Sequence, residues 1–305
     1  MIKPSVAVLI LNYKQPNLTL QCLKSLSKLS YSNYHIYLLD NESDGNLEKR
    51  LSQNCKLKYF KRKDNLGFTK GNNFLIKKAL KDKAEYLLLL NNDTEIKPGL
   101  IEAMLGEYKD ETAGLVGSVI TYFNKSNIVW FAGGSLHPLF FYTRHPGMNK
   151  VFSSTRKLGK IDWITGCCLM IKRSVIEKIG LLDDDYGSYW EDVDWCYRVK
   201  QAGYGLRVVN KPLVLHKVSS SFGKQGTNTL TSQRAYFYGC NPMLFIRKHV
   251  KGWRKYVGVL GQLLLQLPYY MFVMALSRQF SAIIEYLRGI VDGLVKGISN
   301  HNNNF

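Results

Sequence analysis

The sequence lacks the signatures of a secreted or disulfide-bonded protein. Its six cysteines form no Cys-X-X-Cys pair. No secretory signal is recognisable either, because the apolar segment at residues 1–11 is short and continues directly into Asn12 and Tyr13. Both observations predict a reduced, cytoplasmic protein.

Glycine is absent where a dinucleotide-binding protein needs it. Val6–Leu11 is a continuous apolar run, typical of a strand that is buried on both faces of a mostly parallel sheet. A Rossmann protein carries the pattern Gly-X-Gly-X-X-Gly after such a strand. Residues 11–20, LNYKQPNLTL, contain no glycine at all, which argues against a nicotinamide or flavin dehydrogenase.

Acidic residues are scarce. There are 42 lysines and arginines against 23 aspartates and glutamates, and the formal net charge is +19. This balance predicts an anionic partner: a nucleic acid, a nucleotide or an anionic membrane surface. A nucleic-acid-binding protein would need a recognisable module, or basic residues interleaved with exposed aromatics on one surface. The sequence shows neither, so we expect no nucleic acid as a partner.

Apolar residues are numerous enough for a substantial core. Of the 305 residues, 46% are hydrophobic and 12% aromatic, which allows one large α/β domain with an appendage, or two small domains. Apolar segments at 6–11 and 36–39, with a helix-spaced segment between them, predict a βαβ unit, and 86–90 predicts a third buried strand. Further strands are expected in 114–134, 205–209 and 213–215, and residues 140–158 are expected to form a mobile surface loop.

Two aspartates directly follow these strands. Asp40 comes after 36–39, and Asp93 comes soon after 86–90. Ligands of open α/β sheets bind outside the carboxyl ends of the strands, so the two aspartates together favour a site over a turn-forming role. His216 ends a later predicted strand and is a candidate metal ligand at the same edge.

A basic stretch and a glycine-containing helix start lie between these two strands. Residues 56–63 hold five basic residues in eight, which indicates either a solvated edge or a patch that faces an anion. Asn65, Gly67 and Lys70 then precede or begin a helix that is expected to run to Leu80. Glycines and a lysine at a helix start suit a phosphate or a ribose.

The densest group of chemically active residues is Tyr189–Trp195. Glu191 and Asp192 are expected in the first turn of a helix, with Trp190 and Trp195 beside them. The helix dipole keeps carboxylates there ionised unless burial outweighs it. An ionised carboxylate at the mouth of an apolar cleft is a good general base for a hydroxyl. The structural alternative is ordinary helix capping by acids.

The composition changes near residue 245. Val257–Leu276 carries no charge, and its glycines, glutamines and proline favour helices lying in a membrane interface over a transmembrane span, although its length just permits one. Basic residues beside apolar, tyrosine-rich helices suit an anionic leaflet; the alternative is a helical cap packed on the main domain. We therefore divide the chain into a main domain, 1–245, and a membrane-associating helical extension, 246–305. The basic residues are Arg247, Lys248, Lys251, Arg254 and Lys255.

Seven segments in a fixed order make the sequence resemble a known family. The ordered set resembles the family 2 glycosyltransferases of the GT-A fold, especially the bacterial rhamnosyltransferase-like branch, from about Val6 to His249. The resemblance implies a mostly parallel central sheet with helices on both faces. The segments are LNY (11–13), DNESDG (40–45), NLGFTKGNN (65–73), LNNDT (90–94), WITGCCLMIKRS (163–174), YWEDVDWCYRVKQAGY (189–204) and VLH (214–216).

The resemblance also implies a donor site and a metal. Asp93 matches the last acid of the family's DxD-type motif, which ligates a divalent metal, Mn²⁺ or Mg²⁺, on the diphosphate of a sugar nucleotide, and His216 would be the second protein ligand. The sequence departs from the motif at Asn91, where the family has an acid. Asp40 matches the aspartate that contacts the nucleotide base. The other residues assigned to the donor are Asn12, Ser43, Asn65, Gly67, Lys70 and Asn92.

On the acceptor side, the resemblance assigns Asp192 as the general base and Glu191 as a residue that orients the acceptor. Trp163, Gly166 and Trp190 would line the acceptor site. The implied function is an inverting glycosyltransferase on the cytoplasmic face of the membrane, with dTDP-rhamnose as the first candidate donor and UDP-hexoses next. Its acceptor would be a lipid-linked or growing cell-surface glycan. The alternatives are a non-catalytic subunit that binds sugar nucleotides or glycans, favoured by Asn91, and a basic nucleic-acid-binding protein.

Overall fold

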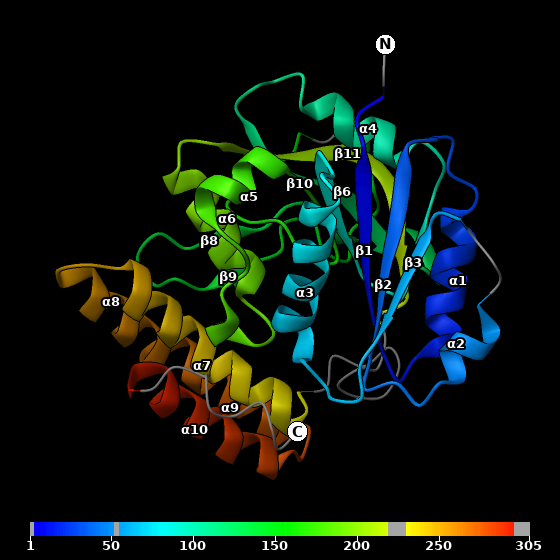
Figure 1. The fold of residues 1–305 in the computed structure, drawn as a ribbon. Coiled ribbons are helices and arrows are strands. Elements are labelled where there is room, and N and C mark those ends of the chain that lie inside the picture. Colours follow the sequence, from blue (N-terminus) through cyan, green and yellow to red (C-terminus); the bar gives the residue numbers. More distant parts are fainter. Residues whose placement is uncertain (1–2, 52–54, 156, 219–229, 296–305) are drawn as a thin grey trace.

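The computed structural model describes residues 3–51, 55–155, 157–218 and 230–295, and its centre is a nine-stranded mixed sheet (Figure 1). The strands are β1 Val6–Tyr13, β2 Tyr34–Asn41, β3 Leu57–Lys61, β4 Tyr86–Leu90, β5 Thr94–Ile96, β6 Ala113–Tyr122, β7 Lys125–Phe131, β10 Cys168–Lys172 and β11 Gly205–His216. Their order across the sheet is β3-β2-β1-β4-β10-β6-β11-β5, and β7 pairs with β6. A separate two-stranded sheet joins β8 Ser135–Leu136 and β9 Thr143–Arg144.

The apolar runs of the sequence form the parallel half of this sheet. Strand β1 pairs in parallel with β2 and β4, and β2 pairs in parallel with β3. Val8, Leu9 and Ile10 are fully buried, because helices cover both faces. Helices within the main domain are α1 Pro16–Leu26, α2 Asn46–Arg50, α3 Gly67–Lys81, α4 Leu100–Glu107, α5 Arg173–Ile179, the 3₁₀ turn η1 Asp184–Tyr186 and α6 Glu191–Gln201.

Strand directions bring distant segments to one edge of the sheet. Strand β10 runs antiparallel to β4 and β6, and β11 runs parallel to β6. The start of β10 and the end of β11 therefore lie at the same edge as the carboxyl ends of β1 and β4. This edge is where the sequence places its site residues.

One expectation about the later segments was wrong, and another was right only in part. The expected strands 205–209 and 213–215 are one strand, β11, because register shifts around Pro212 let the pairing with β6 continue past the proline. The expected surface loop 140–158 contains the short strand β9 and the buried Phe141, whose ring packs near that of Phe245. An aromatic side chain placed in the core ties this loop to the C-terminal helices.

The C-terminal helices gather at one end of the molecule (Figure 1). They are α7 Ser232–His249, α8 Trp253–Gly261, the π-helical turn η2 Gln262–Gln266, α9 Leu267–Leu276 and α10 Phe280–Val295. Helices α7 and α10 cross closely at two glycines: a Cβ atom on Gly239 would lie 2.3 Å from the carbonyl oxygen of Tyr286, and one on Gly289 would lie 2.2 Å from that of Tyr236. The expected division after residue 245 falls inside α7, and residues 296–305 of the expected extension lie outside the described residues.

One helical segment of the described chain is long and apolar enough to cross a membrane. It runs from Trp253 to Leu276 through α8, η2 and α9, with a mean hydropathy of 1.6, and 17% of its most apolar window is buried. Length and composition therefore permit a span, as the sequence indicated, while the glutamines of η2 and their contacts with the main domain are also compatible with a helix at the membrane surface.

Candidate active site

A cavity of about 660 Å³ opens at the carboxyl ends of β1, β4 and β11. It is walled by these strand ends, by the start of α6 and by helices α7, η2 and α9, and its volume is typical of small-molecule sites. The residues lining it that the sequence analysis had assigned to a site are Asn65, Gly67, Asn92, Asp93, Trp163, Gly166, Trp190, Glu191, Asp192 and His216.

Four assigned donor residues do not line this cavity. The carboxylate of Asp40 accepts hydrogen bonds from the amide of Asn12 at 2.6 Å, the hydroxyl of Ser43 at 2.5 Å and the hydroxyl of Tyr59 at 2.9 Å. These contacts tie the ends of β1 and β2 together. Lys70 lies on the first turn of α3 and is also outside the lining. A contact of Asp40 with a nucleotide base stays a prediction.

Asn41, which the sequence analysis did not assign, lines the cavity beside Asn65 and Gly67. Its amide nitrogen donates to Oδ1 of Asn65 at 2.6 Å, and its Oδ1 accepts from the backbone N–H of Leu66 at 2.9 Å. The backbone N–H of Gly67 also donates to Oδ1 of Asn65, at 2.8 Å. The loop that opens α3 is thereby fixed to the end of β2, so the glycine-containing helix start faces the cavity.

Asp93 and His216 meet, although they are far apart in the sequence. Strand β5 pairs antiparallel with the end of β11, which sets His216 opposite Thr94. As a result, Nε2 of His216 lies 3.1 Å from Oδ2 of Asp93, and both side chains are buried. Trp130 packs edge to face against the imidazole, with 4.3 Å between ring centroids. Within the described part of the chain, Nδ1 of His216 has no hydrogen-bond partner.

The Asp93–His216 pair fits a divalent metal as a partial ligand set. Mixed oxygen and nitrogen ligation suits Mn²⁺ and is acceptable to Mg²⁺. Because Nδ1 of His216 has no hydrogen-bond partner among the described residues, it can carry the ring proton while Nε2 binds a metal. Among the described residues, no group of three or more His, Cys, Asp or Glu side chains could hold a metal ion. A metal here would therefore take its other ligands from a bound diphosphate and water, as is usual for Mg²⁺ at phosphate sites. Asn91 lines the same cavity in place of the family's acid.

The acid pair lies at the start of α6, as the sequence predicted. The N-cap residue is Trp190, and no side chain caps the helix. Oδ2 of Asp192 accepts a hydrogen bond from the backbone N–H of Gly166 at 2.9 Å, which joins the WITG segment to the acid pair. Glu191 is buried, and its Oε2 has no hydrogen-bond partner among the residues that the structure describes.

Burial outweighs the helix dipole at this pair. It raises the pKa of Asp192 to about 6, against the opposing effect of the backbone N–H groups of Gly166 and Val193. Burial, followed by the charge of Asp192, raises the pKa of Glu191 well above its usual range. At neutral pH the carboxylate of Asp192 is therefore ionised, while burial and the charge of Asp192 shift Glu191 toward its neutral form, so the two acids are suited to different roles.

A strained turn precedes the acid pair. Tyr189 and Trp190 have φ angles of +64° and +68°, which non-glycine residues rarely adopt. The buried amide nitrogen of Asn241, on α7, is within hydrogen-bond distance of the carbonyl oxygens of Tyr186, Ser188 and Tyr189, at 3.0, 2.8 and 2.6 Å. Helix α7 therefore holds the backbone that aims Glu191 and Asp192 into the cavity.

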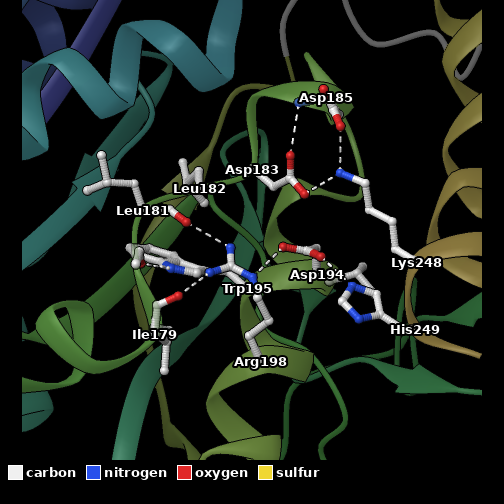
Figure 2. Close-up of polar contacts among 12 residues, drawn as sticks. Ile179, Leu181, Leu182, Asp183, Asp185, Asp194, Trp195, Arg198, Lys248 and His249 are labelled. Atoms are coloured by element: carbon white, nitrogen blue, oxygen red, sulfur yellow. Dashed lines mark hydrogen bonds and ion pairs between the residues drawn. The ribbon is translucent and has the colours of Figure 1, made fainter. Parts of the chain in front are cut away.

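A buried ion network holds the same helix one turn further along (Figure 2). Asp194 is fully buried and accepts hydrogen bonds from Nε of Arg198 at 2.8 Å and from Nε2 of His249, on α7, at 2.6 Å. The other guanidinium nitrogens of Arg198 donate to the carbonyls of Ile179 and Leu181. Burial alone would raise the pKa of Asp194, but the hydrogen bond from His249 and the charge of Arg198 outweigh it, so the pKa is lowered.

The cavity wall at Trp163 depends on one glycine. The indole of Trp163 lies directly over Gly134, where an added Cβ atom would fall 2.0 Å from Cε2 of the ring. Rings of Phe131 and His145 pack against the same indole, with centroids 5.1 and 4.9 Å away. Trp163 is thereby fixed as a flat wall of the cavity, and His145 joins it from the segment that was expected to be a surface loop.

The sequence analysis missed the contribution of the C-terminal helices to this cavity. Arg234 and Tyr238 of α7, Gln262 and Gln266 of η2 and Tyr270 of α9 line it. The amide of Gln262 also donates to the carbonyls of Phe140 and Phe141, at 2.7 and 3.0 Å. One signal for this was present in the sequence: glutamines and tyrosines occur within the otherwise apolar segment 257–276. A helix that faced only lipid would not need these polar side chains.

The fold and the arrangement at the sheet edge define the class of protein. The mixed sheet with helices on both faces is that of the GT-A glycosyltransferase fold. The crystal structure of GalNAc-T7 with UDP, GalNAc and Mn²⁺ matches with a TM-score of 0.59 at 18% identity, covering 79% of this chain and 51% of that one. The family model described as "Glycosyl transferase family 2" matches residues 5–180. The chain belongs to this family.

Two curated relatives show the branch that the chain resembles. It is 26% identical over 183 residues to the N-acetylglucosaminyl-diphospho-decaprenol L-rhamnosyltransferase of Mycobacterium tuberculosis, a match that covers 55% of this chain. It is 21% identical over 228 residues to the dTDP-rhamnosyl transferase RfbF of Shigella flexneri, covering 73% of this chain and 74% of the relative. The chain spans 57% of the length of the mycobacterial relative.

Proposed function

We propose that this protein is an inverting glycosyltransferase that moves a sugar from a nucleotide-diphosphate donor to a hydroxyl of a lipid-linked or growing cell-surface glycan. The observation that carries the proposal is the joining, in one cavity, of the Asp93–His216 pair with the Glu191–Asp192 pair. One pair has the chemistry to hold a metal on a diphosphate, and the other has the chemistry to take a proton from a hydroxyl.

In this mechanism Asp192 is the general base. Its carboxylate, held by the N–H of Gly166, takes the proton of the acceptor hydroxyl as that oxygen attacks the anomeric carbon from the face opposite the diphosphate. The attack inverts the anomeric configuration, so no second carboxylate is needed as a nucleophile. The raised pKa of Glu191 favours its neutral form, which can donate a hydrogen bond that orients the acceptor.

Asp93 and His216 are the proposed metal ligands. A divalent metal there would neutralise the negative charge that develops on the departing diphosphate. Asn92, Asn65 and Gly67 line the same side of the cavity and are proposed to contact the donor. The amide at Asn91 cannot add the charge of the family's acid, which places the electrostatic role of the protein on Asp93.

The relatives support a donor class. dTDP-rhamnose is the first candidate donor, since two relatives are named for rhamnosyl transfer, and UDP-hexoses are the next. A lipid-linked acceptor suits the exposed apolar helices beside the cavity, and we propose that the enzyme acts on the cytoplasmic face of the membrane. A subunit that keeps the nucleotide site without transfer is the second candidate, because Asn91 removes one acid.

A thermal-shift screen against dTDP-, UDP- and GDP-sugars, with and without Mn²⁺, tests the donor site. A ligand at ~100 times its Kd should stabilise the fold by about 2.7 kcal/mol, and we expect such a shift with one nucleotide, only when metal is present. Asp93→Asn and His216→Ala should each remove the metal-dependent part, whereas Asp64→Asn, in an exposed ion pair with Arg62, should not. A shift that ignores metal would exclude the proposed ligands.

The pH dependence of kcat/KM should report Asp192. Because burial raises its pKa to about 6, the carboxylate is ionised and competent above that pH and is protonated below it. The rate should therefore fall about tenfold for each pH unit below 6 and stay flat from about 7 to 8. Initial rates at acceptor concentrations well below KM, in buffers from pH 5 to 8, measure this profile. A rate that continues unchanged to pH 5 would exclude Asp192 as the base.

Membrane association should depend on the exposed apolar side chains of α8, η2 and α9. They include Trp253 and Tyr256 of α8, Leu264 of η2 and Phe272 of α9, and basic residues lie beside them at the start of α8. We expect the protein to float with phosphatidylglycerol-containing vesicles more than with phosphatidylcholine vesicles, and less at high salt. Replacing Leu264 and Phe272 by glutamate should abolish flotation.

The matched control for this substitution is Val151→Glu. Val151 is exposed on the main domain, away from these helices, and its replacement should leave flotation unchanged. Wild-type protein that stays with the soluble fraction at both lipid compositions would contradict the membrane proposal and leave the transferase proposal intact.

A further inference from the structure

We propose that Arg234, set among Tyr189, Tyr238 and Tyr270, forms a subsite for the diphosphate of a lipid-linked acceptor. This inference rests on the proposed function, because it assigns the residue that recognises the acceptor which that function requires. All four side chains line the catalytic cavity. None of them belongs to a segment through which the sequence resembles the family, apart from Tyr189.

The guanidinium of Arg234 is held by aromatic rings. It lies 5.8 Å from the ring centroid of Tyr189 and 5.7 Å from that of Tyr238, and Nη2 donates to the hydroxyl of Tyr238 at 3.4 Å. Aromatic rings orient a guanidinium without neutralising it. The positive charge of Arg234 is thereby positioned in the cavity wall, where it attracts an anion.

The surroundings of this arginine contain few groups that would repel an anion. The sequence has no aspartate or glutamate between Asp194 and Glu285, so the cavity wall formed by α7, η2 and α9 presents only basic and neutral side chains. One of its neutral members, Gln266, can also donate hydrogen bonds, while the amide of Gln262 already donates to Phe140 and Phe141. A guanidinium fork and an amide donor on the same wall suit the oxygens of a diphosphate.

The location fits the acceptor rather than the donor. Tyr189 directly precedes Trp190 and the acid pair, so one side of the subsite adjoins the proposed acceptor position. On the other side, the ring of Tyr270 lies 5.7 Å from that of Tyr238 and 5.2 Å from that of Tyr269, whose side chain is 58% exposed on the apolar face of α9. Arg234 therefore lies between the catalytic acids and the proposed membrane face.

An acceptor on a polyprenyl carrier has its parts in the same order. Its chain stays in the bilayer, its diphosphate lies at the level of the headgroups, and its sugar reaches the base. The donor diphosphate belongs instead to Asp93 and His216, at the ends of β4 and β11. The cavity thus offers two separate positions for phosphate groups, one at the sheet edge and one against α7.

The test measures binding of farnesyl diphosphate and of farnesol to the full-length protein in detergent, with EDTA present, by isothermal titration calorimetry. Wild type should bind the diphosphate at least about tenfold more tightly than the alcohol, since hydrogen bonds to charged groups have effects of this order. Arg234→Gln should weaken diphosphate binding about 10–100-fold and leave farnesol binding unchanged. Arg234→Lys, which keeps the charge without the fork, should retain part of the preference.

Two controls decide among the outcomes. Arg278→Gln removes an exposed charge from the end of α9 and should leave binding unchanged; an equal loss in both variants would show general electrostatic attraction and overturn the subsite. The metal-dependent thermal shift with nucleotide should survive in Arg234→Gln, which also shows that the variant is folded. If that shift is lost while farnesyl diphosphate binding is kept, Arg234 belongs to the donor.

The experiment separates this inference from the proposed function. Asp93→Asn should abolish the metal-dependent nucleotide shift without weakening farnesyl diphosphate binding. If no nucleotide binds to wild type and the Arg234-dependent binding is still found, the subsite stands and the transferase proposal fails. If nucleotides bind and wild type shows no preference for farnesyl diphosphate over farnesol, the subsite is excluded and the transferase proposal stands.

Discussion

Asp192→Asn is expected to lower kcat by about 10²–10⁴-fold, the contribution of a positioned general base. The amide keeps the shape of the side chain but cannot take the proton of the acceptor hydroxyl. Donor binding should be unchanged, because Asp93 and His216 lie on a different wall of the cavity. The melting temperature should equal or exceed that of wild type, since burial already disfavours the charged form of Asp192.

Glu191→Gln is the matched control for this variant. Burial and the charge of Asp192 raise the pKa of Glu191 well above its usual range, and a glutamine reproduces the neutral form that this shift favours, with its hydrogen-bonding ability. We expect kcat to change by less than about tenfold. If Glu191→Gln instead inactivates the enzyme while Asp192→Asn is tolerated, the base is Glu191 and the assignment of roles within the pair is reversed.

Asp194→Ala is expected to cost about 3 kcal/mol of unfolding free energy, at the low end of the range for breaking a buried ion pair, because Arg198 is partly exposed. The substitution removes the acceptor for both Arg198 and His249 (Figure 2). Denaturant unfolding at pH 7 measures the loss. Glu48→Ala, in the exposed pair with Lys61, should change stability by less than about 1 kcal/mol.

The same variant should also lower the rate. Asp194 lies on the helix that starts with the acid pair, and its bond to His249 fixes that helix to α7. Full activity in Asp194→Ala, with only the stability reduced, would show that α7 does not position the acids.

The stabilising effect of Asp194 should depend on pH. Because its pKa is lowered in the folded protein, its contribution is present above the unfolded-state pKa of about 3.9 and disappears as pH falls through the folded-state pKa.

Much of the main domain could be predicted from the sequence because its signals are local. A run such as Val6–Leu11 can bury all of its apolar side chains only in a strand of a sheet that is covered on both faces. The start of α6 was recognisable from the helical spacing of apolar residues after Trp190. That Asp93 and His216 act together could be inferred only through the family resemblance. The structure explains why the two side chains are close: β5 pairs antiparallel with the end of β11.

The role of the C-terminal helices could not be predicted in the same way. Helical periodicity shows which face of α7 is apolar, but it does not tell which segment that face covers. Asn241 and His249 contact the 186–194 segment through tertiary hydrogen bonds that leave no local pattern. Similarly, Asp40 is bonded to Asn12, Ser43 and Tyr59 and is not among the residues that line the cavity. Strand assignment alone does not give the side-chain directions that decide this.

The measurement that tests the central proposal most directly is transfer itself. Purified full-length protein is incubated in detergent with Mn²⁺, dTDP-rhamnose or a UDP-hexose, and a lipid-diphosphate-linked sugar acceptor, and the product is identified by mass spectrometry and by the anomeric signals in its NMR spectrum. We predict a product with inverted anomeric configuration that is absent with Asp192→Asn. A product with retained configuration, or tight metal-dependent nucleotide binding without any transfer across these donors, would contradict the account.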